Sequence, residues 1–218
     1  MAIKERADAT AAGPDAPDAP AVSTAKSRVL DAAMRLFGEQ GYAATSVAQI
    51  EAAAGLRPGS GGLYRHVASK RDLLEQGVRR VLDGPNDVAE ALAATQNETD
   101  VAPSVRLRAI AEAGLARLDH DRDLSRIMLR DLREFPELAA DVRRYEVDGV
   151  TAALAAWLGA RATVTGADVD AAASVMVSAV SHFWTMTDAT GAAPLELGRA
   201  RFLDALVLMV TSALGLDG

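Results

Sequence analysis

The most constraining feature of this chain is a dense run of helix-start and helix-stop signals in its first third. Residues 26–40 place apolar side chains three and four positions apart, as one buried helix face requires. Gly41 follows as a C-cap. Ser46 and Gln49 have the spacing of a capping box, so a second helix begins there and stops at Gly55. Only short helices fit between such closely spaced signals.

Two further helices follow within the same stretch. A Gly-rich turn over residues 56–62 leads into a short third helix over 63–67. Ser69 and Asp72 form another cap-type pair, which opens a fourth helix. Two short helices joined by a Gly-containing turn, with a longer helix before and after them, are typical of a helix-turn-helix DNA reader.

Charge is distributed unevenly along the chain, although the total of 23 basic and 30 acidic residues is acidic. Residues 24–84 hold nine basic and six acidic side chains, whereas residues 85–218 hold twelve and twenty. A basic head on an acidic body would steer an anionic polymer to one end of the molecule. A chance fluctuation of surface charge is the alternative explanation.

Breakers and composition divide the chain into three parts. Residues 1–23 are rich in Pro and Ala and predict a disordered tail. Residues 24–84 form the helix-turn-helix domain, and Gly84-Pro85 marks its end. Residues 85–218 show no strand alternation, so the predicted fold is all-α. The helices predicted there span 86–96, 102–119, 121–134, 136–160, 167–189 and 195–214.

The first helical stretch resembles the tetracycline-repressor (TetR) family of bacterial transcription regulators. The resemblance covers residues 26–82, in order and almost without gaps, whereas the C-terminal part matches only in length and helicity. It implies a ligand-responsive regulator, usually a repressor, that binds a palindromic operator as a homodimer and is released by a small molecule. The matching elements are Val29-Leu30-Asp31-Ala32-Ala33, Leu36-Phe37, Gly41-Tyr42, Thr45-Ser46-Val47, Ile50, Ala54-Gly55, Leu63-Tyr64-Arg65-His66, Ser69-Lys70 and Asp72-Leu73-Leu74.

The resemblance also implies which residues contact DNA. Thr45, Ser46 and Lys70 would bind phosphates. Arg57, Ser60 and Arg65 would read base edges, since an Arg grips guanine with two hydrogen bonds. Packing of Tyr64 into the head, and His66 as an ordinary surface histidine, are the alternatives for those two residues. The implied DNA contacts are Thr45, Ser46, Arg57, Ser60, Gly61, Tyr64, Arg65, His66 and Lys70.

Two departures from the family pattern occur close together. The turn over residues 57–62 is about two residues longer than the family's usual link. Glu51 stands where the family usually has a small residue. We therefore expect the Glu51 carboxylate to accept N–H groups from the Gly-rich turn, since such turns form anion-binding nests. A Glu51 carboxylate more than ~4 Å from every amide of residues 59–63 would contradict this hypothesis.

The last two predicted helices, 167–189 and 195–214, are apolar on more than one face. One face serves the core and the other needs a partner. A homodimer in which both chains contribute these helices to a four-helix bundle satisfies this need. A wholly intramolecular core is the alternative.

Bulky and semi-polar residues of the body are candidates for lining an effector cavity. His182 is the best polar anchor among them, although ordinary core packing is the alternative for each. The effector itself is not identified by the sequence. The candidates are Met128, Phe135, Tyr145, Trp157, His182, Phe183, Trp184 and Met186, with Leu132 and Met176 considered beside them.

The sequence argues against an enzyme, a metal site and a bound cofactor. The chain has no cysteine and three histidines, and none of the latter stands at a metal-ligand or catalytic spacing. It has no apolar run of membrane-spanning length and no signal peptide, so we expect a cytoplasmic protein without a membrane partner. The alternative function is a helical ligand-binding or protein-interaction module without operator-specific DNA binding.

Overall fold

The computed structural model describes residues 25–59, 61–65, 67–84, 87–94 and 101–216, and every regular element in this part of the chain is helical. The predicted tail lies outside the described residues. The four predicted head elements are confirmed in order, and the third is a single 3-10 turn rather than an α-helix. They are α1 (Ala25–Gln40), α2 (Val47–Ala53), η1 (Gly62–Arg65) and α3 (Lys70–Leu82).

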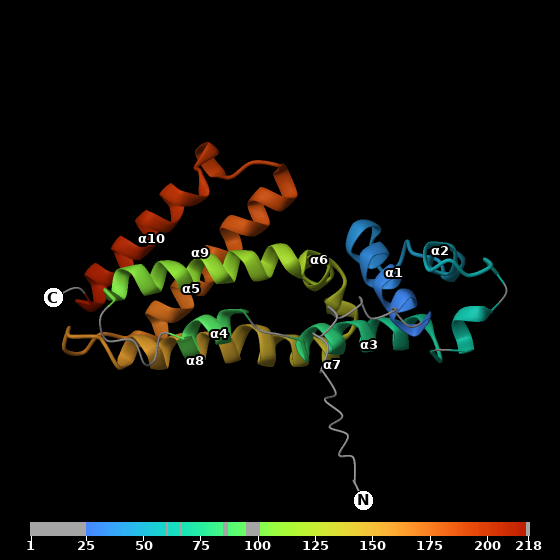
Figure 1. Ribbon diagram of the computed structural model, residues 1–218, viewed down its shortest axis with the longest axis horizontal. Helices are drawn as coiled ribbons and strands as arrows, with labels where there is room; N and C mark the ends of the chain where they lie inside the picture. Colours follow the sequence, from blue (N-terminus) through green and yellow to red (C-terminus); the bar gives the residue numbers. More distant parts are fainter. Residues whose placement is uncertain (1–24, 60, 66, 85–86, 95–100, 217–218) are drawn as a thin grey trace, which may run out of the picture.

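The body extends from the head as a helical array. In Figure 1, α10 and the end of α9 project on one side of α5, and α4 and α8 lie on its other side. The head lies at the opposite end of the molecule from the start of α5. The body elements are α4 (Asp87–Ala94), α5 (Pro103–His120), α6 (Arg122–Arg130), η2 (Leu132–Glu134), α7 (Pro136–Val142), η3 (Arg143–Asp148), α8 (Gly149–Gly159), α9 (Val169–Thr190), η4 (Pro194–Glu196) and α10 (Arg199–Leu214).

Three predicted body helices differ in detail. The helix expected over 136–160 is interrupted by η3, a stretch of π-helix that separates α7 from α8. The helix expected over 121–134 ends at Arg130 and continues as a 3-10 turn. The last α-helix begins at Arg199 rather than at Leu195. Leu195 and Glu196 have positive φ angles of 56° and 51°, which an α-helix cannot contain.

The apolar core of the head continues into the body. Buried residues of α1 and α3, such as Phe37 and Leu74, belong to one cluster with Ile127 of α6 and Leu138 of α7. A second cluster joins α4, α5, α8, α9 and α10. The head is therefore packed on α6 and α7 and is not merely tethered to the body by its chain connection.

Helix α6 is fastened to both the head and the C-terminal helices. Arg130 donates to the carbonyl oxygen of Gly38 at 3.1 Å and also to that of Phe37, so it caps the end of α1. Arg126 donates two hydrogen bonds to Asp188 of α9, at 2.8 and 2.9 Å. These bonds hold the pKa of Asp188 below its ordinary value. Helix α6 thus connects α1 with α9.

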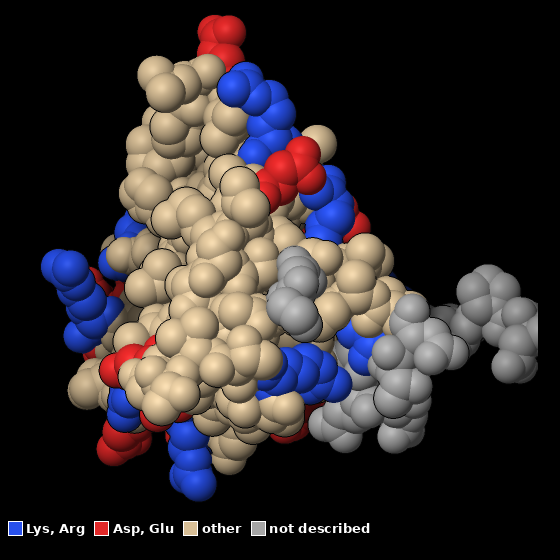
Figure 2. Space-filling model, turned by 90° about the vertical axis from the view of Figure 1, so that its left-hand side faces the viewer, with Lys and Arg blue, Asp and Glu red and all other residues tan. Residues whose placement is uncertain are grey.

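The end of the molecule farthest from the head is largely uncharged. Figure 2 shows this face, with Lys, Arg, Asp and Glu side chains gathered mainly at its margins. Exposed apolar residues of the C-terminal helices include Val175, Leu208 and Met209, which are 60%, 66% and 67% exposed. Within the described residues, no helix is long and apolar enough to cross a membrane.

The close approach of α1 to α6 gives a prediction on stability. A Cβ added at Gly38 would lie 2.7 Å from the Cβ and 2.8 Å from the Cα of Asp123, and backbone atoms cannot rotate away. We expect Gly38→Ala to lower the free energy of unfolding by about 1–2 kcal/mol, because overpacking outweighs the gain in helix propensity. Urea unfolding at fixed protein concentration measures this loss. Gly198→Ala, which meets nothing within 4 Å, is the control, and an equal effect of both changes would contradict the prediction.

Candidate nucleic-acid interface and ligand cavity

The start of α2 is built by the capping box that the sequence predicts. The Gln49 amide N–H donates to Ser46 Oγ at 3.2 Å, and the Ser46 amide N–H donates to Gln49 Oε1 at 2.7 Å. Ser46 is exposed at this helix end. The reciprocal pair fixes where α2 begins and hence how its first turn faces solvent.

Thr45, by contrast, faces into the head. Its side chain is buried, and its hydroxyl donates to the carbonyl oxygen of Gly41 at 2.7 Å. The same hydroxyl accepts a hydrogen bond from Gln40 Nε2 at 3.1 Å. Thr45 therefore holds the loop between α1 and α2, and its phosphate contact remains a prediction.

The Gly-rich turn is held by a buried carboxylate. Glu51 is fully buried on α2. Its Oε2 accepts from the Gly59 amide N–H at 2.6 Å, and its Oε1 accepts from the Leu63 amide N–H at 3.2 Å. Gly59 and Gly61 adopt φ angles of +72° and +71°, which favour glycine. The hypothesis that Glu51 binds the amides of this turn is confirmed.

The turn leads into η1, in which one side chain is buried and the next two face solvent. Leu63 is fully buried and anchors the element, while Tyr64 is 56% exposed and Arg65 is exposed. Arg57 is exposed at the start of the turn, and Gly61 is partly exposed. The predicted contacts Ser60 and His66 lie outside the described residues. Four of the predicted contacts, Arg57, Gly61, Tyr64 and Arg65, therefore lie on one short, solvent-facing segment. Ser46 lies instead at the start of α2, Thr45 is buried just before it, and Lys70 begins α3.

Lys70, at the start of α3, binds the loop between α1 and α2. Its Nζ donates to the carbonyl oxygens of Tyr42 and Thr45 at 2.8 and 2.9 Å, and it lies 4.2 Å from the centre of the Tyr42 ring. The Tyr42 ring in turn contacts Phe37 and Phe135, with ring centres 5.3 and 4.8 Å apart. Lys70 thus ties the start of α3 to the loop before α2. Spacing alone could not distinguish this role from a phosphate contact.

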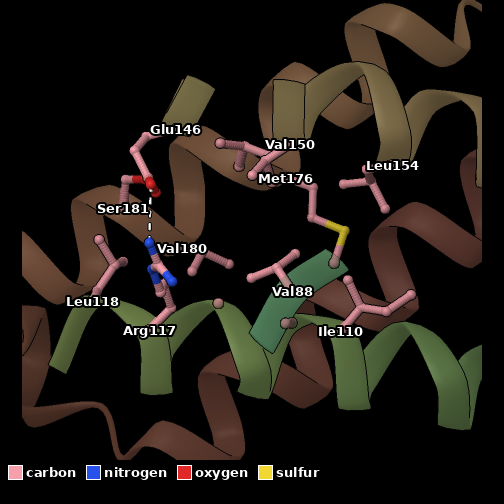
Figure 3. Close-up of a pocket in the computed structure, with 13 residues that line it drawn as sticks. Val88, Ile110, Arg117, Leu118, Glu146, Val150, Leu154, Met176, Val180 and Ser181 are labelled. Atoms are coloured by element: carbon pink, nitrogen blue, oxygen red, sulfur yellow. Dashed lines mark hydrogen bonds and ion pairs between the residues drawn. The ribbon is translucent and has the colours of Figure 1, made fainter. Parts of the chain in front are cut away.

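A cavity of about 90 Å³ lies in the body, among α4, α5, η3, α8 and α9 (Figure 3). Apolar side chains form most of its wall, and Arg117, Glu146 and Ser181 gather at one end. Its lining consists of Val88, Ile110, Ala111, Gly114, Arg117, Leu118, Glu146, Val150, Leu154, Met176, Val177, Val180 and Ser181.

The eight predicted ligand residues do not line this cavity, whereas Met176, considered beside them, does. Tyr145 and His182 are exposed, because they point away from the core of their helices. Phe183 and Trp184 line a separate surface hollow near Gly191. The remaining four are distributed over both cores or their edges: Met128 and Phe135 in the head-side cluster, Trp157 in the body cluster, and partly buried Met186 on α9.

Arg117 joins the polar end of the cavity to the head. Its Nη2 donates to Glu146 Oε1 at 2.9 Å and to the carbonyl oxygen of Val81 in α3 at 3.4 Å. Arg117 also forms an ion pair with Asp121. Burial raises the pKa of Glu146, which Arg117 opposes. The sequence analysis missed this group, and the signal available was an arginine amid the apolar positions of α5.

Among the described residues, no cluster of His, Cys, Asp or Glu could hold a metal ion. The polar groups of the body are instead arranged as ion pairs between helices, such as Arg126 with Asp188. The structure thus has a solvent-facing segment over residues 57–59 and 61–65 at one end, called the reading segment below after its predicted role, and an apolar cavity with one polar end in the body.

Comparison with known proteins finds a family match within the head and a similar fold over most of the chain. The profile of the family "Bacterial regulatory proteins, tetR family" matches residues 29–76. The HTH-type transcriptional repressor KstR2 from Rhodococcus jostii (strain RHA1) is 40% identical over 70 residues. That match covers 32% of this chain and 33% of the repressor, so the chain spans about a third of the length of this curated relative.

Solved structures extend the similarity over most of the chain at the level of the fold. A TetR-like transcriptional regulator from Rhodococcus sp. RHA1 superposes with a TM-score of 0.66 at 20% identity, covering 89% of this chain and 97% of that one. The regulator FadR from Bacillus subtilis, in complex with stearoyl-CoA, gives 0.57 at 17% identity, covering 87% and 95%. The head of this chain accordingly matches the tetR family of bacterial regulatory proteins over residues 29–76, and most of the chain has the fold of TetR-like regulators.

Proposed function

We propose that this protein is a ligand-responsive transcriptional regulator, a repressor, that binds a palindromic operator as a homodimer. The observation that carries the proposal is the reading segment: Glu51 holds the turn between α2 and η1, and Arg57, Tyr64 and Arg65 face solvent from it. Residues 24–84 form the DNA-binding domain in this proposal, and residues 85–218 form the effector and dimerisation domain.

The charges of the two parts support a DNA partner. The head is basic and the body is acidic. Phosphate attracts the former and repels the latter, so DNA approaches the molecule at the head. An acidic body also keeps the rest of the surface off the duplex.

The C-terminal helices supply the dimer surface. Val175 of α9 and Leu208 and Met209 of α10 are large apolar side chains that remain exposed in the single chain. Pairing α9 and α10 with the same helices of a second chain would bury them in a four-helix bundle. A two-fold axis would relate the two heads of such a dimer, so each head could bind one half of a palindromic operator.

Effector binding in the body would change how the heads are held. The cavity wall contains Arg117, and the same guanidinium contacts Val81 at the end of α3. A ligand that rearranges Arg117 therefore acts on the head without touching DNA. Couplings of this kind amount to about 1–3 kcal/mol. The cavity of about 90 Å³ fits a far smaller effector than the stearoyl-CoA bound by the Bacillus subtilis relative.

The decisive experiment selects DNA fragments from a genomic library with the purified protein, at physiological salt and with competitor DNA, and sequences what is retained. We expect a palindromic sequence, with half-sites about 34–36 Å or a multiple of this apart. Recovery of nothing above background would instead favour a ligand-binding or interaction module that retains the fold without operator-specific binding.

Arg65 provides a residue-level test of the reading segment. We expect Arg65→Ala to weaken operator binding by about 1–3 kcal/mol for each head and to relax the base preference, because a side chain that reads a base edge is lost. Fluorescence anisotropy with operator and scrambled duplexes measures both effects. Lys70 is less suitable, since its loss would also release the loop carbonyls that it binds.

The matched control for Arg65→Ala is Arg79→Ala, which removes the same charge from an exposed position near the end of α3. We expect this change to alter operator affinity by less than about 0.5 kcal/mol. Equal losses in the two variants would mean that the head binds DNA through its overall charge alone.

Glu51 tests whether the held turn matters for reading. In Glu51→Gln, one of the two acceptor oxygens becomes an NH₂ group that faces an amide N–H donor, which costs about 1–3 kcal/mol. We expect faster hydrogen exchange at the amides of Gly59 and Leu63, together with weaker operator binding. Glu75→Gln, at a surface ion pair of α3, is the control. Unchanged exchange in Glu51→Gln would show that the carboxylate does not hold the turn.

A further inference from the structure

The polar end of the body cavity has an unusual balance of charge. Arg117 is the cation that lines the cavity, and it is paired with two carboxylates, Glu146 at 2.9 Å and Asp121. The side chains of these three residues are 10%, 20% and 14% exposed. With all three ionised, the group carries one net negative charge in a place that is largely shielded from water.

This balance decides what polar group a ligand can bring. A carboxylate placed beside the group would add a second net negative charge where screening by water is weak. A hydroxyl or an ammonium group would instead donate to Glu146, whose Oε1 is the oxygen that accepts from Arg117. Ser181, at the same end, offers a further hydroxyl.

The pKa of Glu146 points in the same direction. Burial raises it, and the neighbouring Asp121 raises it further, whereas Arg117 lowers it. The interaction with Arg117 therefore does not fully offset the cost of ionising the buried Glu146 carboxylate. A donor supplied by a ligand would stabilise it, and an anion would destabilise it more.

The opposite end of the cavity fixes the rest of the ligand. Met176, Leu154 and Ile110 lie there, away from Arg117 and Glu146 (Figure 3). Because a cavity of about 150 Å³ holds benzene, a cavity of about 90 Å³ suits a molecule of only about three or four non-hydrogen atoms. A short apolar chain would contact the methionine while its polar group meets Glu146.

We propose that the cavity binds a small apolar molecule that carries one hydrogen-bond donor and no negative charge, such as an alcohol or an amine, and that it discriminates against carboxylates. This inference rests on the small-molecule part of the proposed function and names its ligand class. Glu146 sets the specificity, and Arg117, which contacts both Glu146 and Val81, connects the ligand to α3.

Three probes with the same chain of three carbon atoms test the proposal: 1-propanol, propylamine and propionate, each titrated at neutral pH into protein with ¹³C-labelled methionine methyl groups. Met176 reports on the cavity, and Met209, exposed on α10, reports on the surface. We expect saturable shifts of the Met176 signal with the alcohol and the amine, and binding of propionate that is at least about tenfold weaker. Propionate binding as tight as that of the alcohol would overturn the proposal, and so would the absence of any shift at Met176.

Glu146→Gln separates charge from shape. We expect propylamine to lose about tenfold in affinity and propionate to gain, because the net negative charge is removed while the side chain keeps its size. Glu112→Gln, an exposed carboxylate on α5 that pairs with Arg108, should leave the ranking unchanged. An unchanged ranking in Glu146→Gln would also overturn the proposal. Operator binding is measured on the same samples, so a protein that binds the amine but no DNA would contradict the proposed function and leave this inference intact.

Discussion

The contact between α1 and α6 sets the position of the head, and with it that of the reading segment, relative to the body. Gly38 lets the two helices approach so closely that a Cβ there would meet the backbone of Asp123. Arg130 then caps the carbonyl end of α1 by donating to the carbonyl oxygens of Phe37 and Gly38. Because Asp123 and Arg130 both belong to α6, α1 is fixed to the body at its C-terminal end. The loop and α2 that follow inherit their position from this contact.

Helix α6 is also connected to α9 and lies next to the end of α5 that borders the cavity. Arg126 binds Asp188 on α9, a helix that we propose for the dimer interface, and Arg117 lies one turn before the start of α6, at the cavity. Guanidinium groups suit this position because each offers several donors in a fixed plane and can bind a carboxylate on one side and a carbonyl on another. The cavity, α9 and the head are therefore connected through α6 and the end of α5, which would give the proposed coupling a short physical path.

The sequence predicted the head better than the body, and the reason is locality. Capping pairs such as Ser46 with Gln49 act over three residues, so their presence in the sequence nearly guarantees the helix start that the structure shows. The Glu51 contact was also predictable, since a carboxylate and a Gly-rich turn lie eight residues apart. By contrast, the burial of Thr45 and the bridging role of Lys70 depend on how helices pack. No short pattern encodes such packing, which is why the cavity candidates failed to include Arg117 and Glu146.

Burial explains why the residues that sequence reasoning favoured as ligand contacts do not line the cavity. Aromatic side chains such as Trp157 and Phe135 are large and are buried in the two cores. The space that remains lies where smaller side chains meet, at Gly114, Ala111 and the valines of α9. A cavity in a helical body is thus found where small side chains leave space between the helices. Polar groups at its edge, here an arginine shared by two carboxylates, then decide which small molecule it accepts.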